Sequence, residues 1–174
     1  MRARCLIPLA ASLLLAGCGD TATDKFAPAC PQLSLLKDAA SVTRFSGTTQ
    51  DAATLVLAAR IAAVPAACAS AGPGKVKATL HVVADLARGP AAVGNAVTIP
   101  YFVALMDGEK VLNEQDFAIH ATFPANADSS SARDDDIVLT MPVTKTRTAA
   151  AYHIYIGFRL TPAELTYNRR QTTP

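Results

Sequence analysis

Alternation of apolar and polar residues runs through most of the chain after residue 41. Apolar residues take every second position in the runs 76–86, 117–123, 137–143 and 152–160. A repeat of two is typical of strands with one buried face and one face toward solvent. Turn residues separate the runs, and Asp107-Gly108 between two of them is a hairpin signal. The pattern therefore predicts an all-β fold.

We expect a two-sheet sandwich of about seven antiparallel strands, with an immunoglobulin- or fibronectin III-like architecture. The expected strands cover residues 41–49, 54–64, 75–86, 97–106, 111–123, 136–143 and 152–160. Alanines blur the repeat in 54–64, which is also compatible with a helix, and the polar residues 126–133 are expected to form a loop. A short helical turn is predicted within 33–40. A short C-terminal helix is predicted from Thr161-Pro162-Ala163-Glu164, a capping box with proline at the first helical position.

The N-terminus has a different pattern. Arg2 and Arg4 precede an apolar run, and Leu15-Ala16-Gly17-Cys18 closes that run with small residues. This predicts a secretory signal peptide over residues 1–17, too short to span a bilayer. Its last residues and the cysteine resemble the lipobox of bacterial lipoproteins, which implies that Cys18 is lipidated and becomes the first residue. The overall pattern resembles uncharacterised small immunoglobulin-like sandwich lipoproteins of Gram-negative bacteria. The resemblance is specific over Leu15–Cys18, and over residues 41–160 it extends only to the architecture.

Residues 18–29 are polar and small, and they predict a lipidated tether ahead of a β-sandwich domain over residues 30–174. The eleven residues after Cys18 would have an r.m.s. span of about 17–20 Å. In Gram-negative lipoproteins the residue after the lipidated cysteine affects sorting, and Gly19 at this position favours the outer membrane. We therefore expect a protein of the bacterial cell envelope, held by its N-terminal lipid and facing the periplasm.

Charge narrows the classes of partner. The formal net charge is +2, and Arg2 and Arg4 account for all of it. Without residues 1–17 the chain has 14 basic and 14 acidic side chains. No basic excess remains that would attract nucleic acid, so we expect no nucleic-acid partner. No second apolar run reaches about 20 residues, so the lipid is the expected membrane attachment.

The positions of the four cysteines suggest different fates for them. Cys5 leaves with the signal peptide and Cys18 is consumed by lipid, so Cys30 and Cys68 remain as a pair. In an exported protein such a pair favours a disulfide, worth about 4 kcal/mol in the chain-entropy model. Two buried free thiols are the alternative. A metal site is less favoured, because neither cysteine has a C-x-x-C spacing or a local histidine.

Three histidines, His81, His120 and His153, all occupy the polar phase of predicted strands. They would bind a metal if their strands brought them together, but exposed strand residues are the simpler interpretation. Asp128 and the run Asp134-Asp135-Asp136 suggest a calcium-binding patch, although the D-x-D-x-D-G order is missing. A solvated strand entry that discourages edge pairing is favoured instead. We therefore expect no metal and no cofactor.

Catalytic signatures are weak. Glu114 and Asp116 share one strand face, but the two carboxylates of glycosidases normally lie across a cleft on different elements. Residues 129–131 are serines in a polar segment without a linked base, and no G-x-S-x-G, P-loop or dinucleotide fingerprint occurs. We therefore expect a protein that is not an enzyme.

The most apolar continuous stretch covers residues 99–106. Phe102 and Met106 occupy one face of this expected strand, and with a neighbouring Tyr155 they would form a docking patch for a partner. This requires an exposed face; the favoured alternative is a central strand buried on both sides, with a loop or the C-terminal helix covering this face. These observations favour a non-enzymatic binding or assembly module of an envelope protein complex. A small-ligand or glycan-binding lipoprotein, accessory to a transport or secretion system, is the second hypothesis. It requires an aromatic platform, for example from Tyr101, Tyr152 and Tyr155.

Overall fold

The computed structural model describes residues 28–172. The predicted signal peptide 1–17, the predicted lipidation site Cys18 and tether residues 19–27 lie outside this range. Residues 28–172 contain eleven strands in three sheets, two short 3-10 helices and one α-helix. The mostly-β, sandwich-like fold with a C-terminal helix is confirmed, whereas the expected count of about seven strands is too low.

The two longest strands of the described residues are both in sheet A. In sheet A the order is β1 (Gln32–Leu35), β11 (Tyr152–Phe158), β7 (Ala96–Asp107) and β8 (Lys110–Thr122). In sheet B it is β2 (Ser41–Phe45), β3 (Leu55–Ala63), β6 (Val83–Arg88) and β9 (Ser129–Arg133). In sheet C it is β10 (Ile137–Pro142), β5 (Lys75–Leu80) and β4 (Ala66–Ser70). All pairs are antiparallel except β1 with β11, which is parallel and departs from the all-antiparallel expectation.

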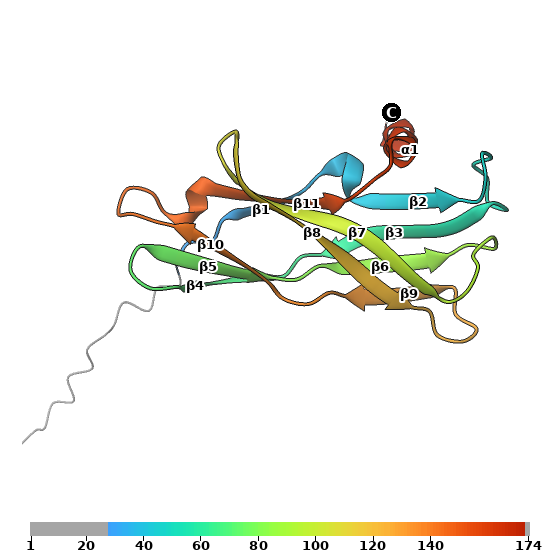
Figure 1. Cartoon of the computed structure of the whole chain (residues 1–174), viewed down its shortest axis with the longest axis horizontal. Helices are drawn as coiled ribbons and strands as arrows, with labels where there is room; N and C mark the ends of the chain where they lie inside the picture. The colour runs from blue at the N-terminus through green and yellow to red at the C-terminus, as the bar shows by residue number, and fades with distance from the viewer. Residues whose placement is uncertain (1–27, 173–174) are drawn as a thin grey trace, which may run out of the picture.

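Sheets B and C together form one long layer. The chain passes from one of these sheets to the other at three places, with only two or three residues between the strands: from β3 to β4, from β5 to β6 and from β9 to β10. We call this shared break, residues 64–65, 81–82 and 134–136, the waist. Backbone hydrogen bonds join its three segments to one another: His81 N donates to Pro65 O at 3.3 Å, and Asp134 N donates to Val82 O at 3.0 Å. Figure 1 shows the two sheets end to end along the long axis, with the β7–β8 hairpin reaching over both.

The waist explains part of the difference in strand count. The single strand expected over 75–86 is split into β5 and β6, although every second side chain from Val76 to Leu86 is at most 5% exposed. Its buried face was therefore predicted correctly, and only the break in pairing was missed. The segment 126–133, expected to be a loop, contains β9, which pairs with β6. The strands β1 and β4 were also missed, because both are short.

A buried polar link joins the two layers at the waist. Tyr101 of β7 is fully buried, and its hydroxyl donates a hydrogen bond of 2.6 Å to Asp134 Oδ2. Burial raises the pKa of Tyr101 above its usual value, and the hydrogen bond and negative charge of Asp134 raise it further. The ring also stacks on Phe117, with centroids 5.5 Å apart. Asp134 therefore has a structural partner, which the sequence did not reveal.

A disulfide joins Cys30, just before β1, to Cys68 on β4, with the Cα atoms 5.7 Å apart. The predicted pairing is confirmed. The bond ties the start of the described chain in sheet A to the edge of sheet C. In the chain-entropy model a loop of this length stabilises the fold by about 4 kcal/mol.

The predicted hairpin and helices are present with adjusted lengths. Asp107 pairs with Lys110 across a two-residue turn, in which Gly108 has a φ of 57°; a positive φ at the first central residue is typical of type II′ turns. The 3-10 helix η1 (Lys37–Ala39) lies inside the helical turn expected over 33–40. The helix α1 (Pro162–Thr172) has three turns rather than about two. A second 3-10 helix, η2 (Ala149–Ala151), precedes β11.

Candidate functional site

A groove of about 510 Å³ lies where η1, α1, the middle of β7 and the C-terminal end of β11 meet. We call it the α1 groove. Its lining mixes apolar and charged side chains: Leu36, Phe102, Leu160 and Leu165 on the one hand, Lys37, Asp38, Arg159 and Arg169 on the other. Volumes of 300–1,000 Å³ with an apolar lining and a few polar groups are typical of ligand sites. The groove is therefore the candidate functional site.

Gly157 allows η1 to form one wall of the groove. A Cβ atom at this position would lie 2.9 Å from the Ala39 Cβ and 3.4 Å from the Phe102 Cε1. The first distance is shorter than real carbon contacts, so a larger residue would push η1 off the sheet. Leu36 N also donates to Ile156 O at 3.0 Å, which continues the pairing of β1 with β11 up to η1.

The helix α1 forms the opposite wall, and its N-terminus has the predicted capping box. Glu164 Oε2 accepts a hydrogen bond from Thr161 N at 2.6 Å, and Thr161 Oγ1 accepts one from Glu164 N at 3.3 Å. The second carboxylate oxygen of Glu164 accepts from Arg44 Nε on β2 at 3.1 Å. One carboxylate therefore both caps the helix and ties it to sheet B.

Asn168 fixes the middle of α1, and sequence reasoning missed it. Its side chain is only 5% exposed, and its Nδ2 donates to the backbone oxygens of Asp38 and Ser41, both at 2.8 Å. We call these contacts the helix dock. The available signal was its spacing, since Leu165 and Asn168 are three residues apart and share a helix face.

Phe102 and Arg159 occupy the sheet side of the groove. The Arg159 guanidinium lies over the Phe102 ring, 4.4 Å from its centroid, in a cation–π contact. Arg159 also donates to Glu114 Oε1 and, at 2.6 Å, to Asp116 Oδ1. Hydrogen bonds to Glu114 and Asp116 raise the pKa of Arg159 above its usual value. The two carboxylates share one strand face, as predicted, but a single guanidinium engages both of them.

The predicted docking patch lies on the outer face of sheet A. Phe102, Met106 and Tyr155 are each half-buried there, on β7 and β11. Phe102 lies opposite Gly157 in the pairing of these strands, and Met106 lies opposite His153. Tyr155 stacks on His153 with centroids 5.5 Å apart. Of the three, Phe102 lines the α1 groove, while Met106 and Tyr155 lie further along the same face.

The three histidines have separate surroundings. His81 accepts from Arg133 Nη2 at 3.2 Å, His120 lies 3.2 Å from Thr98 Oγ1, and His153 stacks on Tyr155. Within residues 28–172 no group of three or more His, Cys, Asp or Glu side chains is placed to hold a metal ion. The hypothesis of a shared histidine metal site is therefore not supported by their placement.

The acidic run is likewise divided among different partners. Asp134 accepts from Tyr101, and Asp136 forms an ion pair with Arg133 at 2.6 Å. Asp128 forms an ion pair with Arg88 at 3.1 Å. These carboxylates do not surround a common point, so the placement favours the solvated strand entry over the calcium patch.

The aromatic platform required for a glycan does not form as expected. Tyr101 and Tyr152 are 0% and 2% exposed, and the Tyr152 hydroxyl donates to Pro142 O at 2.7 Å. Of the three tyrosines only Tyr155 reaches the surface. The serines 129–131 lie on β9 at the edge of sheet B, where Ser131 Oγ contacts Ala84 O at 3.4 Å.

Comparisons with protein-family models, with curated proteins and with solved structures gave no match to this chain. The site is therefore interpreted from its geometry alone. No helix within residues 28–172 combines the length and apolar character needed to cross a bilayer.

Proposed function

We propose that this protein is a non-enzymatic binding module of the bacterial envelope, lipid-anchored at Cys18 to the outer membrane and facing the periplasm. The α1 groove is its binding site, and the partner is a protein of an envelope complex. One observation carries the proposal: four separate elements, η1, α1, β7 and β11, build a groove lined by both apolar and charged side chains. The resemblance to immunoglobulin-like sandwich lipoproteins of Gram-negative bacteria is part of the same proposal.

The anchor is supported by the lipobox Leu15-Ala16-Gly17-Cys18 and by cysteine usage. The Cys30–Cys68 disulfide favours an oxidising compartment, as expected for an exported protein. Replacing Cys18 by serine tests the anchor directly. We expect the wild-type protein in the outer-membrane fraction and the Cys18→Ser protein outside it, and equal fractionation of the two would contradict the anchor.

Binding is favoured over catalysis by the way the polar groups of the groove are used. Arg159 is held by Glu114 and Asp116, and Asp38 forms an ion pair with Arg169 at 3.0 Å. Catalysis requires a nucleophile or base within reach of the reacting atoms and an orienting partner. A phenylalanine and an arginine beside leucines, as in this lining, instead match protein interfaces, in which aromatic residues and arginine are enriched.

Site-specific photocrosslinking in intact cells tests the groove. A photoreactive phenylalanine analogue replaces Leu36, which lines the groove and is 38% exposed, or, as a control, Val138, which is 54% exposed on sheet C. We expect a discrete protein adduct from position 36 and none from position 138. The adduct should be lost when Phe102→Ala is added in the same chain. Identical adducts from both positions, or none from either, would contradict a protein partner in the groove.

A small-ligand module remains the second candidate, because the groove volume of about 510 Å³ matches small-molecule sites. Native mass spectrometry of the protein purified from membranes separates the two. A bound mass of a few hundred daltons, lost in Phe102→Ala, together with no adduct from position 36, would favour the small ligand.

A further inference from the structure

Lysines and arginines have different roles in this protein. Within residues 28–172, eight carboxylate contacts of ion-pair geometry use an arginine as the cation, and a ninth joins His81 Nδ1 to Asp136 Oδ1 at 3.6 Å. None of the five lysines in that range takes part in one. Arginine suits fixed pairing because its planar fork matches a carboxylate, whereas a lysine ammonium is a mobile, strongly hydrated point charge. The lysine charges are therefore available to a partner outside the described chain.

Four of these lysines gather at one end of the sandwich. Lys75 and Lys77 lie on β5 opposite Pro142 and Thr140 of β10, and Val143 N donates to Gly74 O at 2.8 Å. This hydrogen bond brings the turn before β5 beside the loop that carries Lys145. Arg147 of the same loop forms an ion pair with Asp107, whose strand partner is Lys110. We call Lys75, Lys77, Lys110 and Lys145, all exposed, the lysine end.

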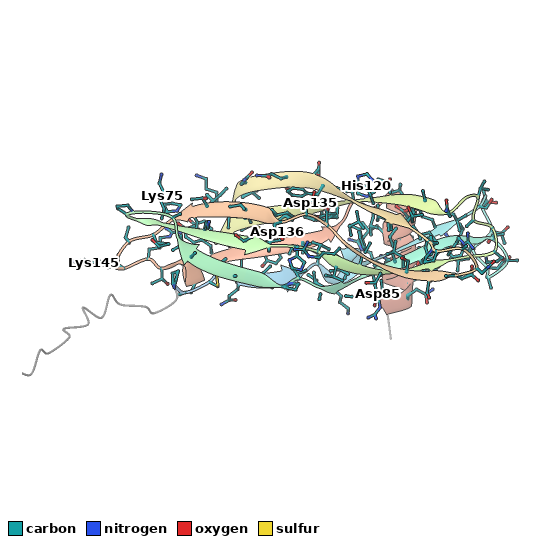
Figure 2. The ribbon with its side chains drawn as sticks, turned by 90° about the horizontal axis from the view of Figure 1, so that it is seen from below. Lys75, Asp85, His120, Asp135, Asp136 and Lys145 are labelled. Atoms are coloured by element: carbon teal, nitrogen blue, oxygen red, sulfur yellow. A yellow bond between two sulfur atoms is a disulfide. The ribbon has the colours of Figure 1, made fainter. Side chains whose placement is uncertain are left out.

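The lysine end is also where the described chain begins. Cys30 is bonded to Cys68 on β4, the strand beside β5. Figure 2 shows Lys75 and Lys145 toward one end of the molecule, with Asp85, Asp135 and Asp136 nearer the middle. In Figure 1, α1 lies away from this end. The α1 groove and the lysine end are therefore separate surfaces.

Charge is distributed unevenly along the molecule. The lysine end with Arg147 has five basic side chains, and Asp107 and Glu109 are the acidic ones beside them, a net charge of +3. The other described residues carry eight basic and ten acidic side chains, a net charge of −2. The near-zero total therefore conceals a basic end and a slightly acidic remainder.

We propose that the lysine end binds the anionic phospholipid headgroups of the leaflet that holds the anchor. This rests on the lipid anchor at Cys18 proposed above, because Cys30, close to the point where the described residues begin, is bonded to Cys68 at the same end. The sequence gives the tether an r.m.s. span of about 17–20 Å, so the end stays close to the surface. A lysine near an anionic leaflet increases the bound population about five-fold, and the effect decays within a Debye length. The lysine end of the domain therefore contacts the membrane surface, and the α1 groove lies on the part of the domain that is farther from the bilayer.

Lysine labelling on vesicles tests this orientation. The full-length, lipidated protein is purified from membranes and reconstituted into vesicles of phosphatidylcholine alone, or of two parts phosphatidylcholine and one part phosphatidylglycerol. An amine-reactive ester labels the lysines, and mass spectrometry of peptides gives the rate at each site. Lys37 on η1, which is exposed and outside the lysine end, is the internal reference. We expect labelling of the lysine end to fall about three- to five-fold relative to Lys37 on the anionic vesicles, and to recover in high salt.

Two variants separate lipid binding from other causes of protection. Lys75→Gln combined with Lys77→Gln and Lys145→Gln should remove the salt-sensitive protection of Lys110. Arg60→Gln, which removes an exposed basic side chain on β3 outside the lysine end and leaves the Lys37 reference in place, should retain it. The proposal would be overturned if the lysine end were labelled as fast as Lys37 on both kinds of vesicle. It would also be overturned if the lysine end were protected to the same extent on neutral and on anionic vesicles, since the tether, with Asp20 and Asp24, would then cover the lysines. A protein that fails to float with either vesicle would instead overturn the anchor, and this inference with it.

Discussion

The waist and the helix dock are both polar junctions between segments far apart in the sequence, yet they hold different parts of the molecule. At the waist, Tyr101 of sheet A reaches Asp134 in the bend of the opposite layer. At the dock, Asn168 binds backbone oxygens of Asp38 and Ser41 beside the groove. The first junction lies between the layers and the second at their margin. We therefore expect damage at the waist to lower the stability of the whole fold, and damage at the dock to act locally on α1 and the groove.

The largest effect is expected from Tyr101→Phe. This change removes the hydrogen bond to a charged acceptor while keeping the buried ring, so the free energy of unfolding should fall by about 1.5–3 kcal/mol. Urea unfolding followed by circular dichroism measures it. The matched control is Tyr155→Phe, because Tyr155 is half-buried on the outer face of sheet A. Equal destabilisation by the two changes would show that the Tyr101–Asp134 hydrogen bond contributes no more to the free energy of unfolding than the hydroxyl of Tyr155 does.

Alkaline pH provides an independent test of the waist. The pKa of Tyr101 is raised in the folded protein, whereas an unfolded tyrosine has a pKa of about 10. The contribution of Tyr101 to the free energy of unfolding is therefore fully present below pH ~10. It is lost as the pH rises further, because the unfolded chain then releases a proton that the folded chain retains. The loss should approach about 1.4 kcal/mol per pH unit. Unfolding free energies measured across this range should show that component in the wild type and lack it in Tyr101→Phe.

A smaller, local effect is expected from Asn168→Ala. The backbone oxygens of Asp38 and Ser41 would lose their donor, at a cost of about 1–2 kcal/mol, partly regained by access to water. Hydrogen exchange followed by mass spectrometry should show faster exchange in α1 and η1, with β7 and β11 unchanged. The photoadduct from position 36 should weaken as well. Gln171→Ala, on the exposed side of the same helix, is the control; faster exchange throughout sheet A would show that the dock is not local.

The two junctions also differ in how far the sequence predicts them. The capping box of α1 was predicted because Thr161 and Glu164 are three residues apart, so a local pattern carries the signal. The waist bond joins residues 33 positions apart and the dock joins residues up to 130 apart. Their partners depend on how the layers pack. The aspartate run and the asparagine were visible in the sequence, but their partners were not.

The same limit applies to strands and to the site. Alternation identified the buried faces of β5, β6, β10 and β11, because burial follows the repeat of two. It missed β9, since residues 129–133 pair along the edge of β6 with little apolar alternation. The outer-face positions of Phe102, Met106 and Tyr155 followed from strand phase. The groove did not, because η1 and α1 come from opposite ends of the described chain and meet over Phe102 only in the folded protein.

The smallest effect is expected from Thr161→Ala, which separates the cap of α1 from its dock. The variant loses the hydrogen bond from Glu164 N to Thr161 Oγ1, at a cost of about 1 kcal/mol. Asn168 and the Arg44–Glu164 ion pair remain, so only the first turn of α1 should exchange faster, and position 36 should still give its adduct. Thr161→Ser keeps the hydroxyl and should restore the exchange rate. If Thr161→Ala disturbed η1 as strongly as Asn168→Ala does, the cap and the dock would be one cooperative unit, and the dock could not be treated as a separate junction.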